Sequence, residues 1–281
     1  FAAQISCTQR RLFCFVPNYK NGHGFHDHSA ASLLKSRSKL SDIAGIKKKK
    51  SSKGTERFES DEDDHNCGKR YEELATLVDS LKECSRKKDL HKGTQIHVDI
   101  IDTGLVEKNM YVGSALVSLY MKCGKLEKAQ EIFDKISNRD AVCWTSLIAG
   151  YAQNGYAEKA LECFENMKRA GFFPNVVTYV CILKACGHSI GACEKGQEVH
   201  AEIVGGGFLD RNAFIGNALV DMYIKLGKLD KAREVFDTLQ VRDTVTWTVL
   251  IAGYTQYGYG EEAVECFQMM MEDGFSPDAT T

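Results

Sequence analysis

His200 and Glu202 form the pair with the clearest potential for catalysis in this chain. An H-x-E motif followed by P-C-x-x-C is the signature of zinc deaminases, in which His and two Cys bind zinc and Glu transfers the proton. No C-x-x-C occurs in the 281 residues, and Cys181, Cys186 and Cys193 are separated by five and seven residues, unlike common zinc-binding motifs. We therefore expect no catalytic activity, no metal site and no cofactor, and we expect His200 and the similarly placed His97 to be helix-surface or core residues.

A second set of histidines, His23, His26 and His28, lies in the segment NGHGFHDH at a spacing that could hold a metal weakly. We predict no metal there, because the segment belongs to a basic leader. The chain also lacks a Walker phosphate-binding loop and a G-x-G-x-x-G dinucleotide motif. The remaining candidates for function are polar residues that recur along the chain, and helices must position them.

The composition is typical of soluble proteins, with 43% hydrophobic and 26% charged residues and a formal net charge of -2. Apolar runs are far shorter than the roughly 18 residues needed to cross a bilayer, so no membrane partner is expected. No motif indicates a small-molecule substrate. With only three prolines in the chain, long helices can run almost uninterrupted.

The first 73 residues differ in charge from the rest. Residues 1–54 contain eleven Lys or Arg and two acids, a basic, Ser-containing composition that is typical of an organelle transit peptide. The run Lys47–Lys50 also fits a nuclear-localisation or nucleic-acid-binding patch. Residues 55–73, which include the acidic stretch ESDEDD, are predicted to be a solvated linker. Because the first methionine is Met110, we expect the sequence to begin within a longer reading frame.

Beyond the linker the chain repeats itself at an offset of 103 residues. The offset aligns Trp144 with Trp247 and Pro174 with Pro277, and longer blocks agree as well. GSALVSLYMKCGKLEKAQEIFD at residues 113–134 aligns with GNALVDMYIKLGKLDKAREVFD at residues 216–237. Within each copy, three modules each show an apolar helical pattern, a Gly-centred turn and a second helical pattern.

The modules are predicted antiparallel helical hairpins at residues 74–109, 110–140, 141–175, 176–212, 213–243 and 244–278, and residues 279–281 begin a truncated next repeat. One hairpin cannot bury its apolar face alone, so neighbouring hairpins must stack around a shared core. The sequence thus predicts an all-α fold, a right-handed α-solenoid superhelix of stacked hairpins.

The modules resemble pentatricopeptide repeats of the land-plant kind that alternates long, short and standard forms. The resemblance covers residues 74–281. Its markers are KGQEVHAEIV at residues 195–204 in a long module (74–109 and 176–212), the short form quoted above (110–140 and 213–243), and AVCWTSLIAGYAQNGYAEKALECFENMKRAGFFPN in a standard module (141–175 and 244–278). Tetratricopeptide repeats share the architecture but have a uniform 34-residue period, which this chain lacks.

The resemblance implies sequence-specific binding of single-stranded RNA in a mitochondrion, or alternatively a chloroplast, with one repeat facing one base. The usual consequence in such relatives is C-to-U RNA editing or other transcript processing, performed by a C-terminal domain in cis or by editing-complex proteins in trans. The alternative from another class is a protein-binding helical scaffold of the tetratricopeptide type.

In the family, the fifth and the last residue of each repeat together read the Watson-Crick edge of a base. Carried over, the pairs are Ser114 with Asp140 for G, Thr145 with Asn175 for A, Asn217 with Asp243 for U, and Thr248 with Asp278 for G. The long modules pair Val78 with Asn109 and Val180 with Asn212, and receive no letter because valine cannot hydrogen-bond a base. The expected RNA is 5′-N-G-A-N-U-G-3′. A competing interpretation is that polar residues near a helix start are N-caps or face solvent.

Charge sets a limit on how such an RNA would bind. Residues 74–281 contain 22 Lys or Arg and 28 Asp or Glu, a net charge of -6, whereas general phosphate binders are usually basic. Affinity must then come from base contacts and from local lysines on one face. We expect a salt dependence shallower than that of a strongly cationic protein.

Overall fold

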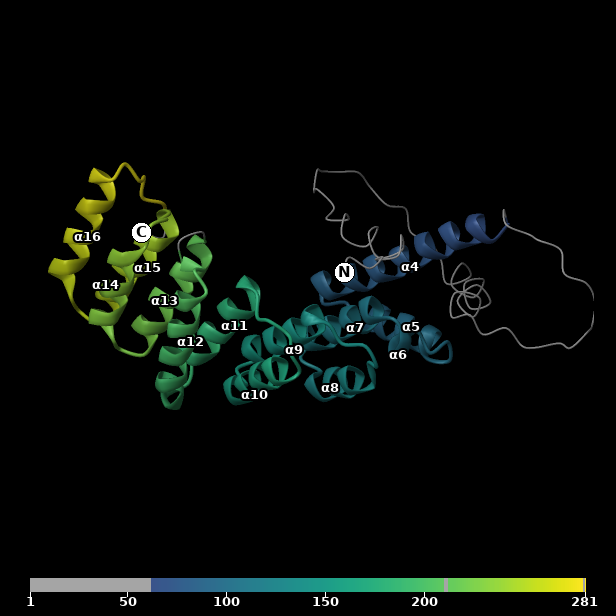
Figure 1. Ribbon diagram of the computed structural model, residues 1–281. Helices are drawn as coiled ribbons and strands as arrows, with labels where there is room; N and C mark the ends of the chain where they lie inside the picture. Colours follow the sequence, from purple (N-terminus) through teal and green to yellow (C-terminus); the bar gives the residue numbers. More distant parts are fainter. Residues whose placement is uncertain (1–61, 210–211, 280) are drawn as a thin grey trace, which may run out of the picture. The chain divides into compact units, whose positions relative to one another are not determined.

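The computed structural model describes residues 62–209, 212–279 and 281 of the chain, and these residues form helices and short connections (Figure 1). The leader predicted at residues 1–54, with its three histidines, lies outside the described residues. The described part contains no strand. The expected all-α solenoid is confirmed, because successive helical hairpins pack one upon the next.

Each module contributes two main helices. The first helices are α4 (Glu62–Lys87), α7 (Met110–Lys122), α9 (Ala141–Gln153), α11 (Val176–Gly187), α13 (Ala213–Lys225) and α15 (Thr244–Gln256). The second helices are α5 (Leu90–Ile101), α8 (Leu126–Lys135), α10 (Ala157–Arg169), α12 (Cys193–Gly205), α14 (Leu229–Thr238) and α16 (Gly260–Glu272). From α7 onward, every first helix begins at the first residue of a predicted module.

The long modules carry extra turns. The short helix α6 (Leu105–Lys108) follows α5, and a 3-10 turn, η1 (Ile190–Ala192), precedes α12. The helix α4 begins at Glu62, inside the segment predicted as a linker, so residues 62–73 of that segment are helical. That segment has no proline and a single glycine, so nothing in it stops the helix that follows from extending backwards.

The hairpin turns depend on glycine in the left-handed region. Gly155 has φ of +80°, and the N–H of Tyr156 donates to the carbonyl of Tyr151 at 2.9 Å, which closes the end of α9 in a Schellman-type turn. A side chain at Gly155 would be strained at this φ. The turn directs the chain back along α9 as α10, so that both helices of the hairpin share one apolar interior.

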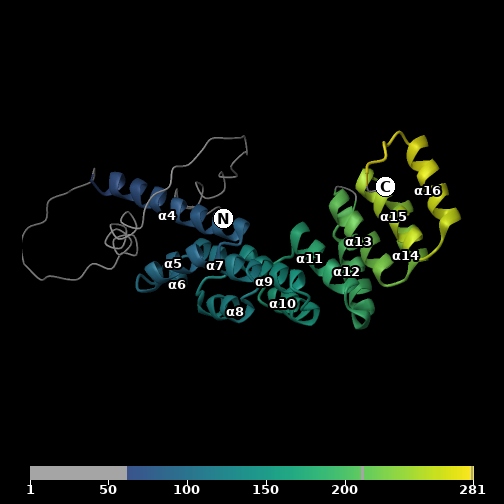
Figure 2. The same ribbon diagram turned by 180° about the vertical axis from the view of Figure 1, so that it is seen from behind.

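Stacking is carried mainly by the first helices. The helix α9 packs between α7 and α11, and α13 packs between α11 and α15, while α10 also contacts α11 (Figures 1 and 2). Gly150 on α9 allows this close approach, since a Cβ there would lie 2.3 Å from Cγ of Met121 on α7. Gly253 has the same relation to Ile224, with 2.5 Å to its Cδ1.

Over the described residues, no helix has both the length and the apolar character needed to cross a membrane.

Candidate nucleic-acid interface

The last residue of each module lies at the helix N-cap of the next module. The cap side chains accept hydrogen bonds from backbone N–H groups of the helix that follows: Asn109 from Tyr111 and Val112 (3.0 and 3.1 Å), Asp140 from Cys143 (2.8 Å), Asn175 from Thr178 (3.0 Å), Asn212 from Phe214 (3.0 Å) and Asp243 from Thr246 (2.8 Å). An N-cap of this kind is worth about 1 kcal/mol. Capping thus belongs to the last residues, and it fixes their positions along one row of helix N-termini.

The fifth residues lie one turn further into the first helices, next to the first helix of the following module. Ser114 and Thr145 are each 8% exposed, as is Val78 in the first long module. Val180, Asn217 and Thr248 are half-buried. None of the six points freely into solvent, so a ligand would meet them only along the line where two first helices adjoin.

Hydrogen bonds bring the fifth and last residues together in the four short and standard modules. Asn217 donates from Nδ2 directly to Oδ1 of Asp243 at 3.2 Å. In the other three modules the connection runs through the third residue of the next module: Ser114 to Cys143, Thr145 to Thr178 (2.8 Å) and Thr248 to Thr281 (2.8 Å). The valines of the long modules can form no such bond with Asn109 and Asn212.

A groove of about 330 Å³ lies along α7 and α9 and reaches the N-terminal end of α11. Its lining includes both Thr145 and Asn175, together with Val142 and Val177, and Lys122 at one side. The volume is at the small end of the range for ligand sites, about 300–1,000 Å³. A predicted base-reading pair therefore faces a groove that apolar side chains flank and a lysine borders.

The flanking valines belong to a series that sequence reasoning missed. The second residue of the first helix is apolar and exposed in five modules: Tyr111 (46%), Val142 (58%), Val177 (57%), Phe214 (72%) and Val245 (52%). The sequence analysis missed these residues because apolar residues in a helical pattern are usually assigned to the core. They could have been found from their position: the residue directly before a buried third residue lies on a different face of the helix, which is exposed to solvent.

Asp243 has the most strongly supported carboxylate of the row. Burial raises its pKa, but hydrogen bonds from the backbone and hydroxyl of Thr246 and from the amide of Asn217 outweigh burial and hold the pKa below its ordinary value. Asp243 is thus ionised at neutral pH and can only accept hydrogen bonds. The amide of Asn217 must therefore present its nitrogen to Asp243 and keep its carbonyl oxygen on the other side.

That carbonyl oxygen, Oδ1 of Asn217, is buried and has no hydrogen-bond partner among the described residues. A buried acceptor without a donor costs about 1–3 kcal/mol, and a ligand N–H recovers this cost only where the groups that cover the oxygen move aside. The Asn217–Asp243 pair therefore has one unsatisfied hydrogen-bond acceptor, the carbonyl oxygen of Asn217. Only a hydrogen-bond donor can satisfy it.

The H-x-E pair has structural contacts instead. His200 on α12 meets the hydroxyl of Tyr223 at 2.9 Å through Nδ1, and Glu202 accepts from the hydroxyl of Tyr179 at 2.9 Å and from Lys168 at 3.2 Å. His97 has the equivalent contact with Tyr120 at 2.9 Å. Across the described ranges, no three His, Cys, Asp or Glu side chains are grouped so as to hold a metal ion.

The string GHSIG at residues 187–191 matches the letters of G-x-S-x-G, a motif that places a nucleophilic serine on a strand-to-helix turn. Here Ser189 follows the helix α11 and precedes the 3-10 turn η1. The Nδ1 atom of the neighbouring His188 is bonded to the backbone carbonyl of Lys184 at 2.7 Å. The string therefore does not form a nucleophile elbow.

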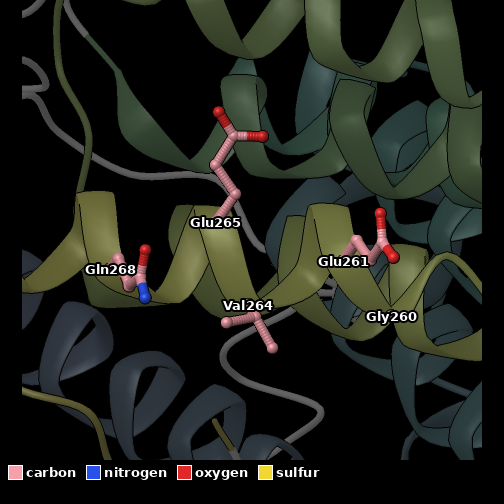
Figure 3. A pocket seen from close by; sticks show the side chains of 5 residues that line it. All are labelled: Gly260, Glu261, Val264, Glu265 and Gln268. Atoms are coloured by element: carbon pink, nitrogen blue, oxygen red, sulfur yellow. The ribbon is translucent and has the colours of Figure 1, made fainter.

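A second hollow, of about 610 Å³, lies on α16 and contains none of the predicted site residues (Figure 3). It is lined by Gly260, Glu261, Val264, Glu265 and Gln268, and both glutamates extend from the helix surface. Two carboxylates without a basic side chain disfavour a polyanion. The nucleic-acid candidate is thus the row of first-helix N-termini and not this hollow.

Comparisons with known proteins agree with the modular pattern. The PPR repeat family model matches residues 139–188 and 242–281, and the PPR repeat model matches residues 114–140 and 217–243. A chloroplastic pentatricopeptide repeat-containing protein of Arabidopsis thaliana is 37% identical over 206 residues, 73% of this chain and 33% of the relative. A mitochondrial one from the same plant is 40% identical over 203 residues, 72% of this chain and 32% of the relative. The chain belongs to the pentatricopeptide repeat family.

This pentatricopeptide repeat chain spans about a third of the length of these curated relatives. Among solved structures, the pentatricopeptide repeat protein PPR10 in complex with an 18-nt psaJ RNA element is similar in fold, with a TM-score of 0.60 at 19% identity over 88% of this chain and 35% of that one. Two of the matched repeats, 114–140 and 217–243, begin at a fifth residue and end at a last residue, so each contains one complete predicted pair.

Proposed function

We propose that this chain binds single-stranded RNA in an organelle and reads its sequence with one repeat per base, in the order 5′-N-G-A-N-U-G-3′. The supporting observation is the Asn217–Asp243 pair, in which an ionised carboxylate orients an amide whose carbonyl oxygen has no donor. A solved structure with a similar fold is a pentatricopeptide repeat protein in complex with RNA, and the mitochondrial and chloroplastic names of sequence relatives favour an organelle.

The orphan oxygen needs a hydrogen-bond donor on the Watson-Crick edge of the base. Uracil offers N3–H, guanine offers N1–H and an exocyclic amine, and adenine and cytosine each offer an exocyclic amine, so this oxygen excludes no base by itself. The family's code selects uracil. The finer proposal is that the RNA site marks a position for C-to-U editing or other processing, with the catalytic domain elsewhere in a longer protein or in an editing-complex partner. We favour the mitochondrion, with the chloroplast as the alternative.

The test is a titration of the full chain with fluorescent RNA of sequence N-G-A-N-U-G and with scrambled oligomers, read by anisotropy. We expect the matched RNA to bind at least about tenfold more tightly, equivalent to 1.4 kcal/mol. Equal affinity for all sequences would contradict the proposal that the chain reads bases. RNA-independent capture of a peptide by the same face would favour the protein-scaffold alternative.

Asn217→Thr sharpens the assignment, because threonine with Asp243 is the family's pair for G. The fifth letter should change preference from U towards G while the second and third letters keep theirs. Val264→Thr on the outer surface of α16, 58% exposed, is the matched control and should change no letter. An unchanged base preference in Asn217→Thr would show that the family's code does not apply to this repeat.

A further inference from the structure

The ninth and the thirteenth residue of each module lie one turn apart on the same face of the first helix. In α7 these residues are Ser118 and Lys122, in α9 they are Ala149 and Gln153, and all four line the groove described above. Because a solenoid presents the same helix face at every step, the equivalent residues of the other modules face the same side.

Contacts of the long modules place their first helices in the same orientation. The Oγ atoms of Ser85, the twelfth residue of its module on α4, and Ser118 on α7 are 3.2 Å apart. On α11 the twelfth residue is Gly187, and a Cβ there would lie 3.3 Å from Cδ of Lys225 on α13. On α7 the twelfth residue, Met121, lines the groove towards α9. The twelfth residues thus all face the next first helix, so the ninth and thirteenth residues of the long modules lie at equivalent positions.

The charge at the ninth and thirteenth positions depends on the type of module. Standard modules have no charge there, short modules have a lysine at the thirteenth position, and long modules have a lysine at the ninth. The residues are Ala149 with Gln153 and Ala252 with Gln256 in the standard modules, Ser118 with Lys122 and Asp221 with Lys225 in the short modules, and Lys82 with Arg86 and Lys184 with His188 in the long modules. The ninth residue is thus a lysine only in the two long modules.

The two ninth-residue lysines differ in their acidic neighbours. Lys82 is 3.7 Å from Asp79 on its own helix, an exposed pair that contributes little to stability. In the second long module the residue equivalent to Asp79 is Cys181. Lys184 is exposed and has no ion pair among the described side chains. Its ammonium group is therefore available to an anionic ligand.

The long modules are also the ones without a polar base-reading pair. Their fifth residues, Val78 and Val180, cannot hydrogen-bond a base, whereas a lysine binds a phosphate whatever base is attached. Residues 74–281 have a net charge of -6, so attraction by overall charge does not hold an RNA backbone. A lysine at the ninth position gives these modules an RNA contact that does not depend on sequence.

We propose that the long modules bind the RNA backbone instead of reading a base, with Lys82 and Lys184 contacting one phosphodiester group each beside the first and the fourth nucleotide. This inference rests on the proposed function and deepens it. Since long modules recur every three modules, the two contacts are three nucleotides apart. The contact of Lys184 is the stronger one because this lysine, unlike Lys82, does not have to leave a carboxylate.

The test uses variants of the full chain and RNA that carries N-G-A-N-U-G with two extra nucleotides at each end. Lys184→Gln removes the charge and keeps most of the side-chain length. The slope of log affinity against log salt should become shallower by about 0.7, the value for one phosphate contact on a single strand. Lys82→Gln should have a smaller effect. Lys231→Gln on the second helix α14 removes the same charge and should leave the slope unchanged.

RNA with one phosphate at a time replaced by an uncharged methylphosphonate locates the contact. With the wild type, this replacement at a linkage flanking the fourth nucleotide should weaken binding about threefold to fivefold. It should have almost no effect in Lys184→Gln, because the charge that the phosphate meets is already gone. Lys82→Gln should lose its sensitivity three linkages closer to the 5′ end. The preference for U at the fifth letter should be unchanged in both variants.

The outcomes separate this inference from the function beneath it. A wild-type chain that binds no RNA overturns the proposed function and the inference with it. Sequence-specific binding in which Lys184→Gln and Lys231→Gln have the same salt slope overturns the inference alone. Methylphosphonate effects at both linkages flanking the fourth nucleotide that are equal in Lys184→Gln and the wild type also overturn it. So does a base preference at the fourth letter, because the long module would then read a base.

Discussion

The two copies of the 103-residue unit share their packing and differ at polar positions of their first helices. The same edge-on ring contacts recur at nearly the same centroid distances: Phe133–Trp144 at 4.7 Å and Phe236–Trp247 at 4.6 Å, His97–Tyr120 and His200–Tyr223 at 5.6 Å, and Tyr151–Tyr156 and Tyr254–Tyr259 at 6.4 Å. Close packing leaves little freedom at the buried rings, so both copies keep the same residues there, and the exposed Tyr156 and Tyr259, each 49% exposed, repeat as well.

Two polar positions of the first helices change between the copies. The fifth residue Ser114 in the first copy corresponds to Asn217 in the second, and Ser118, which lines the groove, corresponds to Asp221. These substitutions alter hydrogen bonding and charge without disturbing the stacking of α7 and α13 on their neighbours. The difference indicates that the fold and the proposed RNA-reading surface are specified by separate sets of residues, so each can be tested without the other.

The largest effect should come from the shared packing. Gly150→Ala places a methyl group within 2.3–2.6 Å of the Cβ, Cγ and sulfur of buried Met121, and Gly253→Ala places one 2.5–3.0 Å from the side chain of Ile224. Each should lower the free energy of unfolding by about 1–3 kcal/mol, as overpacking does. Urea denaturation followed by circular dichroism measures this, and the two copies should respond alike.

Gly260→Ala is the matched control, since a Cβ there meets nothing within 4 Å. It should leave the urea midpoint unchanged or raise it slightly, because alanine favours helix over glycine. If Gly150→Ala were equally harmless, the close approach of α7 and α9 would not be a requirement of the stack.

The next effect concerns one letter of the RNA. Ser114→Asn gives the first copy the Asn–Asp pair of the second, with Asp140 in the role of Asp243. The preference at the second letter should move from G towards U by about tenfold, or 1.4 kcal/mol. Anisotropy titration with the second letter varied measures it. A shift at any other letter would contradict independent reading by each repeat.

How far the sequence predicts these features depends on where the determining contacts lie. Helical periodicity and glycine turns are local, so the hairpins and the first residues of modules such as Met110 and Ala141 follow from the pattern alone. Partners such as Thr145 and Thr178 lie 33 residues apart and adjoin only after stacking. No local pattern shows that Thr145 and Thr178 will contact each other, because each resembles an ordinary polar residue near a helix start. The exposed Val142 and Val177 likewise resemble core residues in the sequence.

A smaller effect tests a feature common to both copies. Burial lowers the pKa of His97 and His200 below the ordinary value of 6.5. Below pH 6.5 the unfolded chain then binds more protons than the folded one, so stability is full above about pH 6.5 and decreases as the pH falls from there. At pH 5.5 the loss is at most about 1.4 kcal/mol per histidine.

The check compares urea midpoints at pH 7.5 and 5.5 for the wild type and for His97→Gln with His200→Gln. Acidic residues contribute equally to both proteins, so the histidine part is the difference between the two pH responses. We expect the double variant to lose less stability on acidification. An identical response would mean that both histidines are protonated as readily in the fold as in the unfolded chain.

The smallest expected effect is on the salt dependence of RNA binding, through one lysine in each copy. Lys122 borders the groove and has no ion pair among the described side chains, whereas Lys225 at the equivalent position is 2.7 Å from Asp221. Both partners of this pair are about a third exposed, so it adds less than about 1 kcal/mol to stability.

Asp221→Ser should leave the urea midpoint unchanged yet free Lys225 for a phosphate. The slope of log affinity against log salt should then steepen by about 0.7, the value for one phosphate contact on a single strand. Ser118→Asp should do the reverse for Lys122. If neither slope moved, the phosphates would run elsewhere than past these two lysines, and the groove would hold the bases without holding the backbone.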